Sequence, residues 1–117
     1  MELINKLQWR YATKKFDKTR KVSPDNLEKI KKAIQLSVSS YGLQFYKILV
    51  IENQELREEL KPVSWNQNQI TNSSHLFVFC NYSEVKTEDI NAFIHLTAKT
   101  RKISYDNLQG YGDFIST

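Results

Sequence analysis

Two segments of the chain have the composition of strands that are covered on both faces. Phe45–Ile51 and His75–Cys80 are rich in β-branched and aromatic residues, with apolar side chains at alternate and at intervening positions. Runs of this kind are typical of inner strands in a sheet that carries helices on both sides. We therefore expect Phe45–Ile51 and Leu76–Cys80 to be neighbouring strands of one sheet, with helices on both faces.

About four helices are expected around these strands. They are Glu2–Trp9, a helix from Pro24 to about Leu36 with Ser23 as its N-cap, Gln54–Leu60 ended by Pro62, and a long helix capped by Thr87 with the apolar stripe Ile90, Phe93 and Ile94. Gln67–Asn72 is expected to add a further helical turn. The tail from Ser104 onward has no convincing helical or strand period.

This set of elements is short of strands. The 117 residues are expected to form a single domain, 1–117. A two-stranded sheet is marginal alone and cannot cover several amphipathic helices. The remaining strands must come from another chain or from a part of the protein outside this sequence, so we expect a domain truncated at its C-terminus.

Positive charge is concentrated near the N-terminus. The chain has 17 Lys and Arg residues against 13 Asp and Glu, a net charge of +4. Six of the basic residues fall close together: Arg10, Lys14, Lys15, Lys18, Arg20 and Lys21. Such a cluster attracts an anionic partner, which could be a phosphate-bearing cofactor, nucleic acid or an acidic lipid surface. The alternative is a solvated basic loop.

Several classes of protein and site are disfavoured. No apolar run is long enough to span a membrane, and the first residues do not form a secretory signal. Cys80 is the single cysteine, so no internal disulfide or thiolate metal cluster can form, and a cytoplasmic location is expected. Three glycines cannot make a glycine-rich phosphate loop. His75 and His95 lack ligand spacing, so they are interpreted as structural and no metal site is expected.

Three polar clusters remain as candidates for binding. Arg10–Phe16 is a basic turn after a helix, able to hold a phosphate. Ser37–Gln44 is a turn of small and polar residues before a buried strand, with amides exposed to a flat ligand. Asn66–Gln69 is rich in amide side chains, which both donate and accept and so suit the edge of a heterocycle.

In this order the clusters resemble the FMN-dependent nitroreductase family of NAD(P)H oxidoreductases. The motifs that carry the resemblance are Arg10-Tyr11-Ala12-Thr13-Lys14-Lys15-Phe16 and, about thirty residues on, Ser37-Val38-Ser39-Ser40-Tyr41-Gly42-Leu43-Gln44, followed directly by an apolar strand. The similarity covers nearly the whole chain. It implies an α+β, three-layer α/β/α fold, built as a homodimer with FMN at the interface.

The resemblance also implies roles for individual residues. Arg10 would bind the FMN phosphate, Lys14 would lie near the flavin pyrimidine edge, and Asn66 would bond the ring. Ser39 and Ser40 would reach the flavin of the opposite subunit. The residues expected to bind the cofactor are Arg10, Tyr11, Ala12, Thr13, Lys14, Val38, Ser39, Ser40, Gly42, Asn66 and Gln69. No side chain is assigned a catalytic role, since hydride would pass from NAD(P)H to the flavin and then to a nitroaromatic or quinone-like acceptor.

The sequence departs from the family pattern at four of these positions. Ala12 replaces a hydroxyl residue, Val38 a proline, Gly42 an asparagine and Gln69 a second lysine. Members of the family also continue well beyond Thr117. The chain therefore looks like the N-terminal half of a nitroreductase, and on its own we expect it to bind FMN weakly or not at all and to self-associate.

Two other functions remain open from the residues alone. The first is a noncatalytic interaction module whose basic loop, with Trp9, Tyr11 and Phe16, contacts nucleic acid by neutralising phosphates and stacking on bases. Against it, the basic residues do not continue along a helix or a sheet face. The second is a half-fold that binds no flavin.

For the flavin site itself we expect Arg10 and Lys14 to face a common cleft, since they lie four residues apart in one turn.

Overall fold

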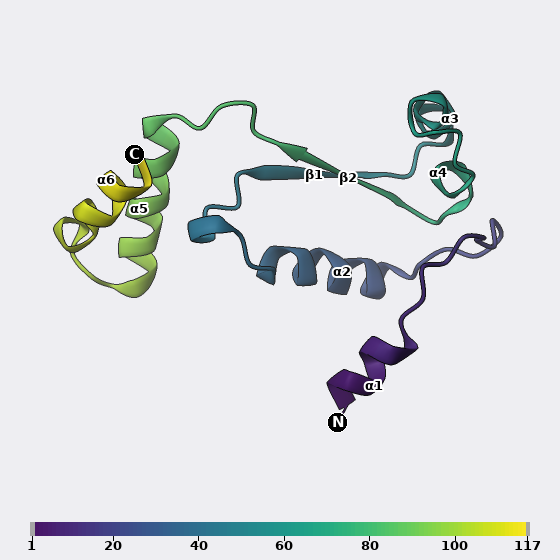
Figure 1. Ribbon diagram of the computed structural model, residues 1–117, viewed down its shortest axis with the longest axis horizontal. Coiled ribbons are helices and arrows are strands. Elements are labelled where there is room, and N and C mark those ends of the chain that lie inside the picture. Colours follow the sequence, from purple (N-terminus) through teal and green to yellow (C-terminus); the bar gives the residue numbers. More distant parts are fainter. Residues whose placement is uncertain (1, 117) are drawn as a thin grey trace. The chain divides into compact units, whose positions relative to one another are not determined.

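The computed structural model describes residues 2–116 as helices, strands and ordered connections. Along the chain the elements are α1 (Glu2–Trp9), α2 (Pro24–Leu36), the 3-10 helix η1 (Ser40–Gly42), β1 (Tyr46–Ile51), α3 (Gln54–Val63), α4 (Gln69–Asn72), β2 (Leu76–Asn81), α5 (Thr87–Arg101), the 3-10 helix η2 (Tyr105–Leu108) and α6 (Gln109–Ser116) (Figure 1). They form two compact units. The first runs up to Lys29 and resumes over Leu49–Val78, and the second contains Ile30–Ile48 and the chain from Phe79 onward.

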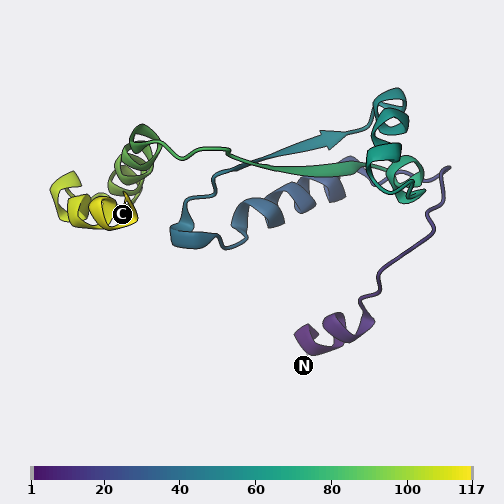
Figure 2. The ribbon, with the colours of Figure 1, turned by 45° about the horizontal axis from the view of Figure 1, so that its top comes forward.

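The two strands pair as expected. β1 and β2 are hydrogen-bonded neighbours, each within one residue of the segment that its composition predicts. They run in opposite directions (Figure 2). The end of β2 accordingly lies beside the start of β1, where the backbone N–H of Tyr82 donates to the carbonyl of Phe45 at 3.1 Å. The rings of Phe45 and Tyr82 stack at the same end, with centroids 5.6 Å apart.

The strands are less covered than their composition predicts. No residue of β1 or β2 is fully buried, and Leu49 and Phe79 keep 51% and 61% of their surface exposed. Within residues 2–116, therefore, the cover that we expected on both faces of the sheet is not supplied. The physical reason is size, since two strands offer too small a surface to hold helices on both sides.

The most deeply buried apolar residues belong to α5. Ile90, Ile94 and Ala98 lie four residues apart on one face of this helix and are at most 6% exposed. That face packs against α6, where Gly112 is also buried. Phe93, which the sequence predicts in the same stripe, is half-buried. The tail has more regular structure than expected, because η2 and α6 pack on α5 although their sequence lacks a helical period (Figure 1).

Local signals predicted most helix ends, with two corrections. Ser23 caps α2 as expected, since its hydroxyl accepts the Asn26 N–H at 3.3 Å. Pro62 does not end α3 at Leu60, because the helix continues through it to Val63. The N-cap of α5 is Lys86 rather than Thr87. Its backbone N–H donates to Oδ2 of Asp89 at 3.0 Å, so the Asp89 carboxylate closes the first turn.

Candidate functional site

The basic segment after α1 is exposed and has no regular secondary structure. Arg10 still donates its backbone N–H to the Lys6 carbonyl at 3.2 Å, which extends the helical bonding by one residue. Thr13 donates to the Tyr11 carbonyl at 3.1 Å. All residues from Arg10 to Lys14 are exposed, so their side chains are accessible to a ligand. Whether Arg10 and Lys14 face a common cleft stays a prediction.

A short turn at Asp17 ends this segment. The Asp17 carboxylate accepts the Thr19 hydroxyl at 2.6 Å and the Thr19 backbone N–H at 2.9 Å. These two hydrogen bonds hold the pKa of Asp17 below its ordinary value, since both favour the charged carboxylate. The Arg20 N–H donates to the Asp17 carbonyl at 3.2 Å and closes the turn. The basic segment is thus followed by an ordered turn rather than by an unstructured tail.

The Ser37–Gln44 turn has an unusual backbone. Tyr41 and Gln44 have φ values of 52° and 50°, in the left-handed region that side chains disfavour, and Gly42 lies there too with φ 73°. The Ser39 hydroxyl accepts the Gln44 backbone N–H at 3.0 Å. Ser39 is half-buried, whereas Ser40 is exposed and Val38 is 99% exposed. The turn therefore presents two hydroxyl groups on a strained but well-bonded backbone.

The amide-rich cluster follows α3. Trp65 and Asn66 both have φ 54°, and the Asn66 N–H donates to the Lys61 carbonyl at 3.0 Å. This bond satisfies a carbonyl of the last turn of α3, as a C-terminal cap does. Asn66 is exposed, and Gln69 is half-buried at the start of α4. The Asn66 side chain is thus presented at a capped helix end.

The three clusters divide between the two units. Arg10–Lys14 and Asn66–Gln69 belong to the first unit, and Ser37–Gln44 belongs to the second. Each cluster is well defined within its own unit. That all three meet around one ligand stays a prediction.

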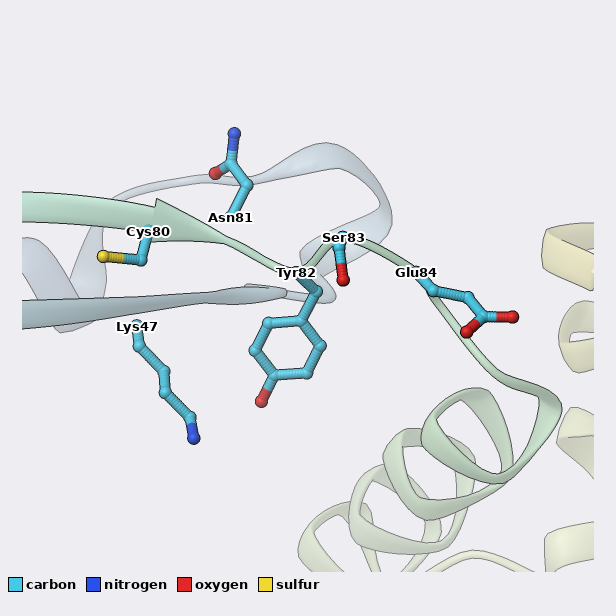
Figure 3. A pocket seen from close by; sticks show the side chains of 6 residues that line it. All are labelled: Lys47, Cys80, Asn81, Tyr82, Ser83 and Glu84. Atoms are coloured by element: carbon cyan, nitrogen blue, oxygen red, sulfur yellow. The ribbon is translucent and has the colours of Figure 1, made fainter.

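The second unit contains two cavities of interest. The larger, about 550 Å³, borders the Ser37–Gln44 turn at Tyr41 and Gly42, and its other walls include Tyr111 and Arg101. The smaller, about 380 Å³, lies at one end of the sheet, where the side chains of Lys47 and Tyr82 extend to the same side (Figure 3). The smaller cavity contains none of the residues that the motifs predict for cofactor binding, whereas the larger one contains Gly42.

Both histidines have structural partners. Nε2 of His75 lies 3.3 Å from the Glu52 carboxylate, and its Nδ1 lies 2.8 Å from the Ser74 hydroxyl. His95 stacks on the ring of Tyr105, with centroids 4.2 Å apart. These contacts support the interpretation of both histidines as structural residues.

Two features of the structure are not predicted by the sequence. Arg57 is fully buried and donates to carbonyls in α4 and just after it. In the sequence it precedes Glu58 and Glu59 on what reads as a surface helix. The Tyr41 ring makes edge-on contacts with Tyr111 and Phe114, about seventy residues along the chain. No sequence spacing indicates either feature, because both depend on how distant segments pack.

The comparisons with known proteins agree with this fold and these motifs. Residues 7–111 match the family described as the nitroreductase family. A Staphylococcus haemolyticus protein, an NAD(P)H nitroreductase by name, is 33% identical over 111 residues, which cover 95% of this chain and 51% of that protein. The fold of this chain is that of the nitroreductases. The structure of a nitroreductase-like protein from Streptococcus mutans superposes on it with a TM-score of 0.82 at 17% identity, covering 98% of this chain and 55% of that one.

A second solved structure is informative about ligands. The structure of a nitroreductase from Exiguobacterium sibiricum in complex with FMN superposes with a TM-score of 0.71 at 20% identity, covering 99% of this chain and 55% of that one. This chain is thus an α+β protein with a nitroreductase-like fold. The chain belongs to the nitroreductase family. It spans about half the length of the S. haemolyticus relative.

The donors present suit the chemistry of FMN. Arg10 and Lys14 are accessible cations for a phosphate or an electron-rich ring edge. The Ser39 oxygen accepts the Gln44 N–H, so its own proton is left to donate to a ligand. Asn66 offers an exposed amide that both donates and accepts.

No helix in the described part of the chain is long and apolar enough to cross a membrane.

Proposed function

We propose that this protein functions as an FMN-dependent oxidoreductase, with NAD(P)H as the reductant and a nitroaromatic or quinone-like molecule as the acceptor. The observation that carries this proposal is the family match over residues 7–111, which contains every residue expected to contact FMN. When bound, FMN would take up hydride from NAD(P)H and pass it to the acceptor. The chain's own residues would bind and orient the cofactor.

The proposed roles follow the accessible groups. Arg10 binds the phosphate, where a guanidinium can make two parallel hydrogen bonds. Lys14 places positive charge near the pyrimidine edge. Ser39 and Ser40 donate hydroxyl protons, and Asn66 bonds the edge of the ring. Gln69, where the family pattern has a second lysine, leaves that edge with less positive charge. Tyr11, Ala12, Thr13, Val38 and Gly42 would line the cofactor through backbone and side-chain contact.

We further propose a homodimer with the flavin at its interface and a cytoplasmic location. The exposed apolar surface supports association, since Leu3, Ile4 and Leu7 on α1 are 55–70% exposed. The single cysteine supports a reducing compartment. Because the chain spans about half of its relatives, we propose that a further segment completes the flavin site, and the affinity of residues 1–117 alone is expected to be weak.

A titration of FMN tests this proposal. Flavin fluorescence is followed as the 117-residue chain is added, at low ionic strength because exposed cations are screened by salt. We expect saturable quenching that Arg10→Gln and Lys14→Gln each weaken by about 3–10-fold, in line with the loss of one hydrogen bond of ordinary net strength at an exposed site. Lys6→Gln, which removes an exposed charge from α1, is the matched control and should leave the affinity unchanged.

The same titration identifies the alternative functions. If the wild-type chain causes no quenching when it is added to millimolar concentration, residues 1–117 do not bind flavin by themselves and the proposed function fails for this chain. Retention of a single-stranded oligonucleotide that falls with salt, together with no flavin quenching, would instead favour the nucleic-acid module.

A further inference from the structure

The Ser37–Gln44 turn needs a restraint to hold its shape. Tyr41 and Gln44 both occupy left-handed backbone conformations at φ 52° and 50°, which are costly for residues with a Cβ. Conformations of this kind persist where surrounding contacts over-determine them, and they are found preferentially at functional sites.

Gln44 makes the contacts that close the turn. Its side-chain Nε2 donates to the carbonyl of Gln35 at 2.7 Å and to the carbonyl of Ser37 at 3.3 Å. Its backbone N–H donates to the Ser39 hydroxyl at 3.0 Å. One residue thus ties the last turn of α2, the start of the loop and Ser39 together. The Gln35 carbonyl belongs to the end of α2, where carbonyls lack helical partners.

The direction of these bonds determines what Ser39 can offer. Its oxygen accepts from the Gln44 backbone, so the hydroxyl proton is free to point to a ligand. In the described part of the chain the Gln44 side chain has two carbonyl acceptors, which require its NH₂ group to face them. If the Gln44 side-chain bonds were lost, Ser39 and Gln44 would relax, whereas the Tyr41 carbonyl would still accept the Tyr111 hydroxyl at 3.3 Å.

We propose that Gln44 is the positioning residue of the flavin-contact turn: it bridges the end of α2 to Ser39 and so holds the Ser39 hydroxyl proton outward for the cofactor. This inference rests on the proposed function. Gln44 itself is not one of the residues expected to touch FMN. It acts through Ser39 rather than on the ligand.

Three variants separate this role from general stability. Gln44→Glu keeps the shape of the side chain but replaces the donor with a carboxylate, which repels the two carbonyls. Gln44→Lys restores a donor, and a cation is favourable at a helix C-terminus. Gln35→Ala is the control, because its side chain bonds to Lys32 and only its backbone carbonyl, which the variant keeps, serves the turn.

The first readout needs no flavin. Amide hydrogen exchange is measured by NMR on the full chain. In Gln44→Glu we expect exchange at Gly42, Leu43 and Gln44 to accelerate by about tenfold, as the loss of hydrogen bonds of ordinary strength predicts. Gln44→Lys should return the rates to within about threefold of the wild type, and Gln35→Ala should not change them. Exchange at Ile94, in the α5 core, should be unaffected in all three.

The second readout is FMN affinity by fluorescence quenching. It should fall by about 5–10-fold in Gln44→Glu and recover in Gln44→Lys. Unchanged exchange in Gln44→Glu, or acceleration that extends to Ile94, would overturn the positioning role. So would a rescue of exchange without a rescue of affinity. If the wild-type chain shows the expected exchange pattern but binds no FMN, the proposed function fails while the role of Gln44 in holding the turn stands.

Discussion

The guanidinium group of Arg57 donates from Nε to the carbonyl oxygen of Ile70 at 2.7 Å. Its two terminal nitrogens reach the carbonyls of Ser73 and Ser74, and Nη2 also bonds the Ser73 hydroxyl at 2.9 Å. The side chain is completely buried. A single arginine from α3 thereby donates to three carbonyls in α4 and just after it, where a helix end leaves carbonyls without helical partners.

Replacing Arg57 with Met should destabilise the chain by about 2–4 kcal/mol, because three partly buried carbonyl groups each lose a hydrogen bond at once. Urea unfolding followed by circular dichroism measures the change. Arg20→Met is the matched control, since Arg20 is exposed and its loss should change the free energy of unfolding by less than about 0.5 kcal/mol. Equal losses in the two variants would show that the Arg57 contacts do not stabilise the fold.

Ser74→Ala should loosen the attachment of the N-terminal segment. The Ser74 hydroxyl accepts the backbone N–H of Val22 at 2.8 Å, across 52 residues of sequence. We expect a loss of about 1 kcal/mol and faster amide exchange at Val22, because this N–H loses its acceptor. Ser83→Ala, in an exposed loop, is the control. An unchanged exchange rate at Val22 would contradict the prediction.

The two glycines of α6 should respond differently to alanine. A Cβ at Gly112 would lie 3.2 Å from Cγ1 of Ile94, a side chain that is 1% exposed and has little room to move. A Cβ at Gly110 would meet nothing within 4 Å. We therefore expect Gly110→Ala to stabilise the chain by about 0.5–1 kcal/mol through helix propensity, and Gly112→Ala to cancel or reverse that gain. Thermal unfolding compares them; equal stabilisation would mean that Ile94 can yield.

The pKa of Asp17 should depend on Thr19. The two hydrogen bonds from Thr19 lower the pKa of the Asp17 carboxyl, so they stabilise the turn above its ordinary pKa and are lost as the pH falls through the lowered value. Thr19→Val removes the hydroxyl donor and should raise the pKa of Asp17 toward its ordinary value. NMR titration of the carboxyl carbon measures it. A pKa that does not move would exclude the hydroxyl bond in solution.

Self-association should depend on the apolar face of α1. Because Leu3, Ile4 and Leu7 are more than half exposed, the 117-residue chain is expected to elute from a sizing column above its monomer mass. The double variant Ile4→Lys, Leu7→Lys should shift elution toward the monomer. Asn5→Lys adds a charge to the same helix outside this apolar group and is the control. If all three proteins elute together, association does not involve this face.

The helices α1 and α2 were predictable because the spacing of their apolar residues and, for α2, the N-cap are local properties of the sequence. The limits of α1 and α2 match the expectation, and Ser23 caps α2 through a contact only three residues away. The strands were predictable to within a residue from their β-branched and aromatic composition. In contrast, α6 could not be predicted, since Gly110 and Gly112 weaken its local preference and packing on α5 holds it in place.

The candidate site likewise has features that the sequence predicts and features that depend on the tertiary structure. The residue types in the clusters Arg10–Lys14 and Ser37–Gln44, and their order along the chain, are properties of the sequence, and they were sufficient to indicate the family. The left-handed backbone at Tyr41 and Gln44, the bonds of the Gln44 side chain and the burial of Arg57 came only from the tertiary structure. The reason is physical: residue types and their spacing are properties of the sequence itself, whereas a costly backbone conformation or a buried charge is adopted only where the folded chain supplies contacts that compensate for it.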